Sequence, residues 1–181
     1  MHKMMKNITI SKLDAAKRQL ETVIRLYFFD GDPVSIHTLT SAAYNVIRDV
    51  NAKKGGDPML VKEKALEFVK PEYREEFRKS LNNAENFFKH ADKDHDQTLD
   101  FNPDQSEMLI WDAISTYSNL TGETPPLFKI FQAWFVCNKP EMFVPPEEIK
   151  RWLATTGPEL ASIGKTGFFN KWLPVVMQLG T

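Results

Sequence analysis

Residues 11–33 read SKLDAAKRQLETVIRLYFFDGDP, and this stretch predicts two consecutive helices. Ser11 suits a helix N-cap, because its hydroxyl can accept a hydrogen bond from the first turn. Asp30-Gly31 is typical of a turn, and Pro33 suits the first turn of the next helix. Between these signals the apolar residues recur at helical spacing: Leu13, Ala16, Leu20, Val23, Ile24, Tyr27 and Phe28. The stretch therefore predicts the first two helices of a bundle.

The remainder of the chain also shows helical periodicity, with no alternating run that would indicate a sheet. Short connections favour antiparallel neighbours. We expect one all-α domain, with a mostly antiparallel bundle at about 10–122 and a Trp- and Phe-rich helical flank at about 123–181. Beyond the first helix, the predicted helices lie at about 33–52, 59–69, 71–91, 103–121, 124–139 and 145–157, followed by a loop at 164–167 and a helix at 168–179 interrupted at Pro174.

Composition excludes several classes of protein. Of the 181 residues, 42% are hydrophobic and 26% are charged, which is typical of folded soluble proteins and not of disordered chains. A net charge of -1 does not support bulk electrostatic binding of nucleic acid. Cys137 is the single cysteine, so neither an intramolecular disulfide nor a cysteine zinc cage can form. The chain shows no signal-peptide pattern and no long apolar run, so we expect a cytoplasmic protein that does not enter a membrane.

A loop rich in aspartates lies between two predicted helices and is similar to an EF-hand calcium loop. The spacing of its carboxylates suits a hard cation, but the glycine normally found at the sixth position and the glutamate at the twelfth are both replaced. The alternative is a solvated acidic connection. We expect no cofactor, with a divalent metal ion as the alternative, for which the candidate ligands are Asp92, Asp94, Asp96 and Asp100.

The predicted helix that precedes this loop carries a polar stripe. Lys79, Asn83, Asn86 and His90 lie within about 60° of one another on a helical projection. Such a stripe can bind a phosphate or orient a catalytic base if it faces a cleft. The alternative is the solvent-exposed side of an amphipathic helix.

A second polar flank lies on the predicted helix at 33–52. Its members are His37, Ser41, Tyr44 and Arg48, and Arg48 can hold a phosphate through two hydrogen bonds. If this flank faced the first stripe, the two would form a cleft suited to an anion or nucleotide. The alternative is that His37 packs or bonds locally near the start of its helix.

Two short segments resemble members of the HEPN superfamily, helical-bundle domains of bacterial conflict and RNA-processing systems. One segment, DPVSIHTLTSAAYNVIRDV, covers residues 32–50, and the other, NFFKHADKD, begins at Asn86. Active HEPN ribonucleases carry an arginine followed four to six residues later by a histidine, and no arginine of this chain has that neighbour. The resemblance therefore implies a non-catalytic member of the superfamily.

Three functional hypotheses follow, in order of preference. The first is a non-enzymatic module that binds a partner protein or a nucleotide-like ligand in a bacterial host-defence or toxin-antitoxin setting. An apolar patch near Trp134, Phe143 or Trp152 would support it. The second is an RNA-cleaving or nucleotide-processing enzyme that uses His90, and the third is a calcium-type binding protein. A homodimer is a further hypothesis, since two-fold pairing is the commonest assembly.

Overall fold

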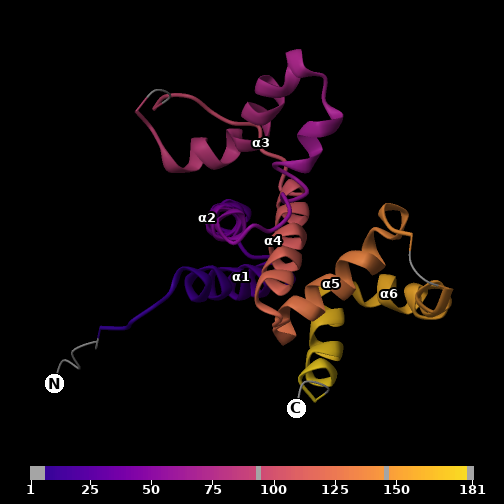
Figure 1. Cartoon of the computed structure of the whole chain (residues 1–181). Coiled ribbons are helices and arrows are strands. Elements are labelled where there is room, and N and C mark those ends of the chain that lie inside the picture. Colours follow the sequence, from indigo (N-terminus) through magenta and orange to yellow (C-terminus); the bar gives the residue numbers. More distant parts are fainter. Residues whose placement is uncertain (1–6, 93–94, 145–146, 179–181) are drawn as a thin grey trace.

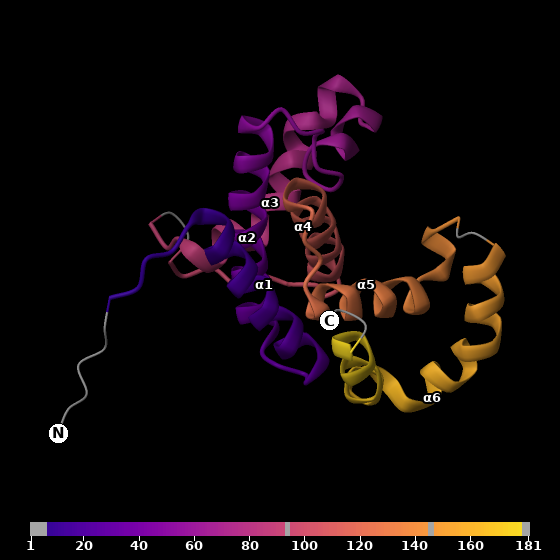
Figure 2. The same cartoon turned by 60° about the horizontal axis from the view of Figure 1, so that its bottom comes forward.

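The computed structural model describes residues 7–92, 95–144 and 147–178, and within these ranges it contains helices and no β-strand (Figures 1 and 2). The predicted all-α bundle is therefore confirmed. The α-helices are α1 (Lys12–Phe28), α2 (Pro33–Lys53), α3 (Arg74–Lys89), α4 (Gln105–Thr121), α5 (Pro126–Asn138) and α6 (Glu147–Gln178), and the short 3-10 helices are η1 (Lys64–Phe68), η2 (Pro71–Tyr73) and η3 (Pro140–Met142).

The first two helices begin as their capping residues predict. Ser11 Oγ accepts a hydrogen bond of 3.1 Å from the backbone N–H of Asp14 at the start of α1. Asp32 plays the same part for α2, where its carboxylate accepts a bond of 2.7 Å from the N–H of Ser35. Pro33 occupies the first turn of α2, where a backbone N–H would have no carbonyl partner within the helix. The lack of an N–H in proline therefore breaks no hydrogen bond of α2.

The turn between α1 and α2 depends on two neighbouring residues in different ways. Asp30 adopts the left-handed conformation, with φ of 53°. Gly31 donates a hydrogen bond of 2.7 Å to the carbonyl of Leu26, and a Cβ at this position would lie 2.9 Å from Leu26 Cβ. Glycine is therefore required at position 31 for the close approach of the chain and not for a positive φ.

One continuous apolar core joins α1, α2, α4, α5 and α6. Phe28 lies near its centre, where its ring centroid is 5.0 Å from that of Phe169 and 6.1 Å from that of Trp134. Aromatic pairs at such distances add to the stabilisation from apolar burial. Aromatic residues of α5 and α6 thus pack directly onto α1. Figure 2 shows the C-terminal part of α6 beside α1.

Helix α3 is attached to the molecule differently. Among the helices of the described ranges it packs against α2, η1 and η2 alone, and it contributes no residue to the main apolar core. The segment from residue 54 to α3 lies at the top of Figure 1, away from α5 and α6. The attachment of α3 to the rest of the molecule is largely polar.

The helix expected at 59–69 is wrong. The structure has turns there, followed by the five-residue η1. The N–H groups of Lys64 and Ala65 bond to the carbonyls of Met59 and Leu60, five residues back, in place of the α-helical spacing of four. The backbone N–H groups of Leu60 and Val61 donate to the carboxylate of Asp112, and that of Lys62 donates to the hydroxyl of Tyr44, so contacts with α2 and α4 fix where this segment lies.

The sequence pattern also misplaces the breaks between helices in the C-terminal part of the chain. The helical backbone continues through residues 157 and 158, where an end was expected, and through Pro174, where an interruption was expected. The break lies at Gly164, whose φ of 61° and ψ of 179° are non-helical. Glycine adopts this conformation at little steric cost, so the expected loop at 164–167 is reduced to one residue.

None of the helices in the described part of the chain combines the length and the apolarity that a bilayer crossing requires.

Candidate functional site

A buried carboxylate fastens the segment after α2 to the bundle. Asp112 on α4 accepts hydrogen bonds of 2.7 Å from the Tyr44 hydroxyl, 3.2 Å from the N–H of Leu60 and 2.8 Å from the N–H of Val61. Burial, reinforced by the negative charge of Asp112, raises the pKa of Tyr44. Tyr44 was expected to bind a ligand, but its side chain is fully buried and its hydroxyl is occupied by these contacts.

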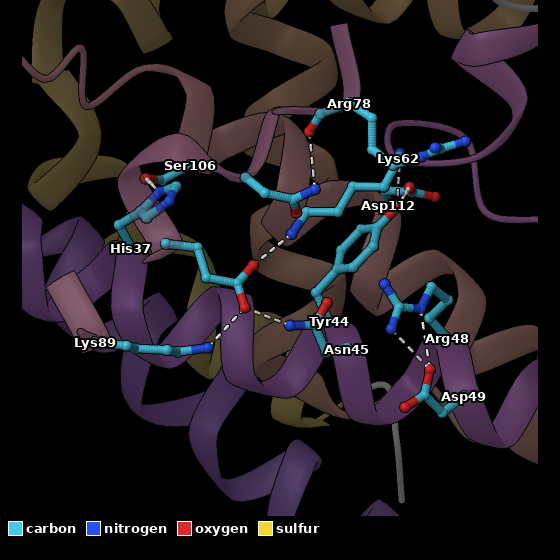
Figure 3. A network of polar contacts seen from close by, with 12 residues as sticks. His37, Tyr44, Asn45, Arg48, Asp49, Lys62, Arg78, Lys89, Ser106 and Asp112 are labelled. Carbon is cyan, nitrogen blue, oxygen red and sulfur yellow. Dashed lines mark hydrogen bonds and ion pairs between the residues drawn. The ribbon is translucent and has the colours of Figure 1, made fainter. Parts of the chain in front are cut away.

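A second buried carboxylate holds α3. Glu85 accepts contacts of 2.6 Å from Lys62 Nζ, 2.6 Å from Lys89 Nζ and 2.5 Å from Asn45 Nδ2, so that three donors converge on one carboxyl group (Figure 3). We call these four residues the Glu85 clasp. Burial alone would raise the pKa of Glu85, but the hydrogen bonds from the two lysines outweigh it and hold this pKa at about 2. Glu85 is therefore ionised at neutral pH.

For Lys62, burial outweighs the hydrogen bond in setting the pKa, which is the opposite of the balance at Glu85. Burial is the largest influence on its ammonium group and lowers its pKa, although the hydrogen bond to Glu85 opposes the change. The nearby positive charges of Arg48 and Lys89 lower it further. Lys62 therefore lies close to two further cations as well as to its partner carboxylate.

Next to the clasp lies a cleft of about 410 Å³ between α2, the segment 58–67 and α3. Cationic residues from three separate elements line it: Arg48 from α2, Lys62 from the segment and Arg78 from α3 (Figure 3). Of these, Lys62 is almost fully buried with its ammonium paired to Glu85, so Arg48 and Arg78 are the more accessible cations. Arg48 donates from two nitrogens to one oxygen of Asp49, at 3.0 and 2.9 Å. The cleft is lined by Arg48, Pro58, Lys62, Glu63, Leu66, Glu67, Arg78 and Asn82.

The acidic side chains of this cleft differ in their availability. Glu63 accepts a hydrogen bond of 2.7 Å from the N–H of Met59, so one of its oxygens stabilises the local turn. Glu67 is exposed. The cleft is therefore lined by residues of both signs of charge.

The polar stripe expected to form a site lies on the outer face of α3. Lys79, Asn83, Asn86 and His90 are all exposed. Lys79 pairs with Glu75 at 2.9 Å, and His90 is the C-cap residue of the helix. The structure places this stripe opposite the buried face of α3, which matches the alternative reading as a solvated face.

His37 lies in the interior. Its Nδ1 is 2.9 Å from Ser106 Oγ, and its ring packs edge-on against Phe88 and Phe101 at centroid distances of 5.8 and 5.1 Å. Burial, reinforced by the positive charge of Lys62, lowers the pKa of His37 to about 4. The imidazole is therefore neutral and fully buried, whereas His90 is exposed, so the two do not share one accessible cleft.

The described part of the aspartate-rich connection shows no preformed ion cage. Asp92, Asp96 and Asp100 are exposed, and Asp94 lies outside the described residues. In residues 7–92, 95–144 and 147–178, no group of three or more histidine, cysteine or acidic side chains is arranged to hold a metal ion.

The expected apolar patch of the C-terminal flank is partly internal. Trp134 is buried and donates a hydrogen bond of 2.9 Å to the hydroxyl of Tyr27. Phe143 is half-buried against other aromatic rings, and the side chain of Trp152 lies outside the described residues. The exposed apolar side chains of the described flank include Met142 and Val144, on either side of Phe143, and Val175 and Met177 near its end.

Sequence reasoning missed the residues that organise this region, although a signal for two of them was present. Glu85 shares a helix face with Leu81 and Phe88, and Asp112 shares one with Leu109 and Ala113. A carboxylate inside an apolar stripe indicates a buried, paired charge. Lys62, Arg78 and Asn82 carry no comparable signal, because their roles depend on contacts between elements.

Comparison with known proteins found no matching family model, no matching curated protein and no matching solved structure.

Proposed function

We propose that the protein is a non-enzymatic binding module that holds a nucleotide-like ligand by its phosphates in the cleft between α2, the segment 58–67 and α3. The observation that carries the proposal is that Arg48, Lys62 and Arg78, from three different elements, line one cleft. Guanidinium groups bind phosphate oxygens through paired hydrogen bonds. A volume of about 410 Å³ lies within the usual range of small-molecule sites.

The two acidic residues of the cleft suit a nucleotide better than free phosphate. Proteins often bind Mg²⁺ through one or two carboxylates together with the phosphates of a nucleotide. Glu63 and Glu67 supply carboxylates beside the cations. In this proposal the divalent ion arrives with the ligand and is not a resident cofactor.

The enzymatic alternative has less support from the geometry. A nuclease using His90 with Asn86 and His37 needs these side chains around one substrate. His37 is fully buried, while Asn86 and His90 are exposed on the outer face of α3. The resemblance to the HEPN superfamily, the host-defence setting, a protein partner, a homodimer and calcium binding stay predictions.

The test is calorimetric titration of the full chain with ATP and with tripolyphosphate, each in the presence and absence of Mg²⁺. Arg78→Ala is the informative variant, because Arg78 is an exposed residue that lines the cleft. Its matched control is Lys79→Ala, which removes the adjacent exposed cation on the outer face of the same helix.

We expect Arg78→Ala and Arg48→Ala each to weaken ATP binding about tenfold or more, since each removes a charged phosphate contact. Lys79→Ala is expected to leave the affinity unchanged. The proposal is wrong if ATP and tripolyphosphate do not bind, or if Lys79→Ala weakens binding as much as Arg78→Ala does. Equal affinity for ATP and tripolyphosphate would assign recognition to the phosphates alone.

A further inference from the structure

We propose that α3 is a movable wall of this cleft, that the Glu85 clasp holds it closed, and that a phosphate-bearing ligand stabilises the closed position. The part of this inference that concerns the ligand rests on the proposed function. The part that concerns the movement of α3 stands on the contacts of α3 itself.

The first support is the small apolar contact of α3 with the bundle. Within the described helix, Ala84 and Glu85 are the buried residues, and neither belongs to the main core. Phe88 supplies an aromatic contact near one end, against His37 and Phe101. Regions with few buried apolar contacts open at lower free energy than the core does.

The second support is that the main fastening is one buried carboxylate. The side chains of Lys62 and Glu85 are 4% and 8% exposed, and their charged atoms lie 2.6 Å apart. Lys62 belongs to the segment before α3 and Asn45 to α2, so Glu85 joins three parts of the chain at one point. Removing one partner of a buried ion pair is strongly destabilising, because it leaves the other charge uncompensated.

The third support is a line of buried polar atoms on α2 without partners among the described residues. They are His37 Nε2, Ser41 Oγ and Asn45 Oδ1, spaced four residues apart and thus along one face of the helix. This face meets α3, since Asn45 donates to Glu85 and His37 contacts Phe88. Burying polar groups without partners costs free energy, which opening of α3 recovers by hydrating them.

Opening of α3 would take the cleft apart. Arg78 and Asn82 move with α3, while Arg48 stays on α2. A ligand whose phosphates contact both Arg48 and Arg78 binds the closed arrangement better, and it shifts the equilibrium by that difference in affinity. Lys62 belongs to both the cleft and the clasp, so the two are physically connected.

Hydrogen-deuterium exchange of the full chain tests the movement. In the wild-type protein we expect the amides of 74–89 to exchange by local opening, faster than those of α1 and α4. Glu85→Gln should accelerate exchange of 74–89 about tenfold or more without changing α1 and α4. Its control is Glu75→Gln, which removes an exposed pair on the same helix and should change little.

The outcomes separate the two proposals. If 74–89 and α1 exchange at one common rate in the wild-type protein, α3 does not open locally and the inference is wrong, even if Glu85→Gln does not fold. If ATP with Mg²⁺ binds by calorimetry but does not slow exchange of 74–89, the coupling is wrong while the proposed function stands. If ATP does not bind, the proposed function fails, and the apo comparison of Glu85→Gln with Glu75→Gln still decides the clasp.

Discussion

Lys62 Nζ lies 2.6 Å from Glu85 Oε2, and both side chains are almost completely buried. This pair links the irregular segment after α2 to α3, two parts of the chain that contribute little to the apolar core. A buried pair of this kind gives little net stability compared with apolar residues, but it fixes the arrangement of the elements that carry it. Here it holds α3, which carries Arg78, against the segment and α2, which carries Arg48.

Breaking the Lys62–Glu85 pair should lower the free energy of unfolding, whereas replacing both residues with apolar ones should restore most of it. Lys62→Met is expected to lower the free energy of unfolding by about 2–4 kcal/mol, because Glu85 stays charged and buried with fewer partners. The double variant Lys62→Met/Glu85→Leu should recover most of this loss. Urea unfolding measures both values. A double variant less stable than Lys62→Met alone would contradict the expectation.

Asp112 should matter more than Tyr44 in the neighbouring cluster. Asp112→Ala leaves two buried backbone N–H groups and a hydroxyl without an acceptor, and we expect a loss of about 3 kcal/mol. Tyr44→Phe removes one donor from the carboxylate and the acceptor of the Lys62 N–H, and should cost about 1–2 kcal/mol. Urea unfolding compares the variants, and equal losses would disprove the central role of the carboxylate.

Acid should destabilise the protein in two separate pH ranges. The pKa of His37 is about 4 in the folded protein and about 6.5 when unfolded, so the unfolded chain binds more protons between these values. Stability therefore falls as the pH drops from about 6.5 to 4, by on the order of 2 kcal/mol. Glu85, with a folded pKa of about 2 against an ordinary 4.5, adds a second loss as the pH falls from 4.5 toward 2.

Urea unfolding at a series of pH values measures both ranges. His37→Gln should flatten the dependence between pH 6.5 and 4 while keeping the loss at lower pH. A stability that stays constant from pH 7 to 4 in the wild-type protein would show that His37 keeps an ordinary pKa.

Asp30 and Gly31, in the turn between α1 and α2, should respond to substitution with opposite changes in stability. Gly31→Ala places a Cβ 2.9 Å from Leu26 Cβ, which requires the chain to shift and should cost about 1–2 kcal/mol. Asp30→Gly relieves a non-glycine residue at φ of 53° and should be neutral or slightly stabilising, although it loses an exposed ion pair with Lys165. Thermal unfolding of the two variants tests this. A destabilising Asp30→Gly and a neutral Gly31→Ala would reverse the roles assigned to these residues.

The helical signals of the sequence were reliable for features that depend on neighbouring residues, namely where a helix begins and which of its faces is buried. Ser11 caps α1 and Pro33 begins α2 as predicted, because a helix start depends on groups within a few residues of one another. The apolar stripe of α1 became its buried face, from Ala16 to Phe28. Local spacing contains all of this information.

The sequence pattern failed where distant groups compete with local ones. The segment 59–69 has a helical pattern, but the N–H groups of Lys64 and Ala65 bond to carbonyls five residues back and not four. Asp112 and Tyr44, which come from other helices, hold the N–H groups at the start of this segment. The polar stripe of α3 was correctly grouped on one face, yet the spacing alone could not say which face meets α2. Its orientation follows from Glu85, whose burial is tolerated because Lys62, Lys89 and Asn45 surround it.

The sequence by itself therefore determined the all-α class, the positions of most helices and the cap that begins the first of them, since these depend on residues within a few positions of one another. The tertiary structure alone decided that His37 is buried, that His90 faces solvent and that Arg48, Lys62 and Arg78 meet in one cleft. The physical reason is that a site of this kind is made by contacts between elements, and helical periodicity fixes a face without choosing its neighbour.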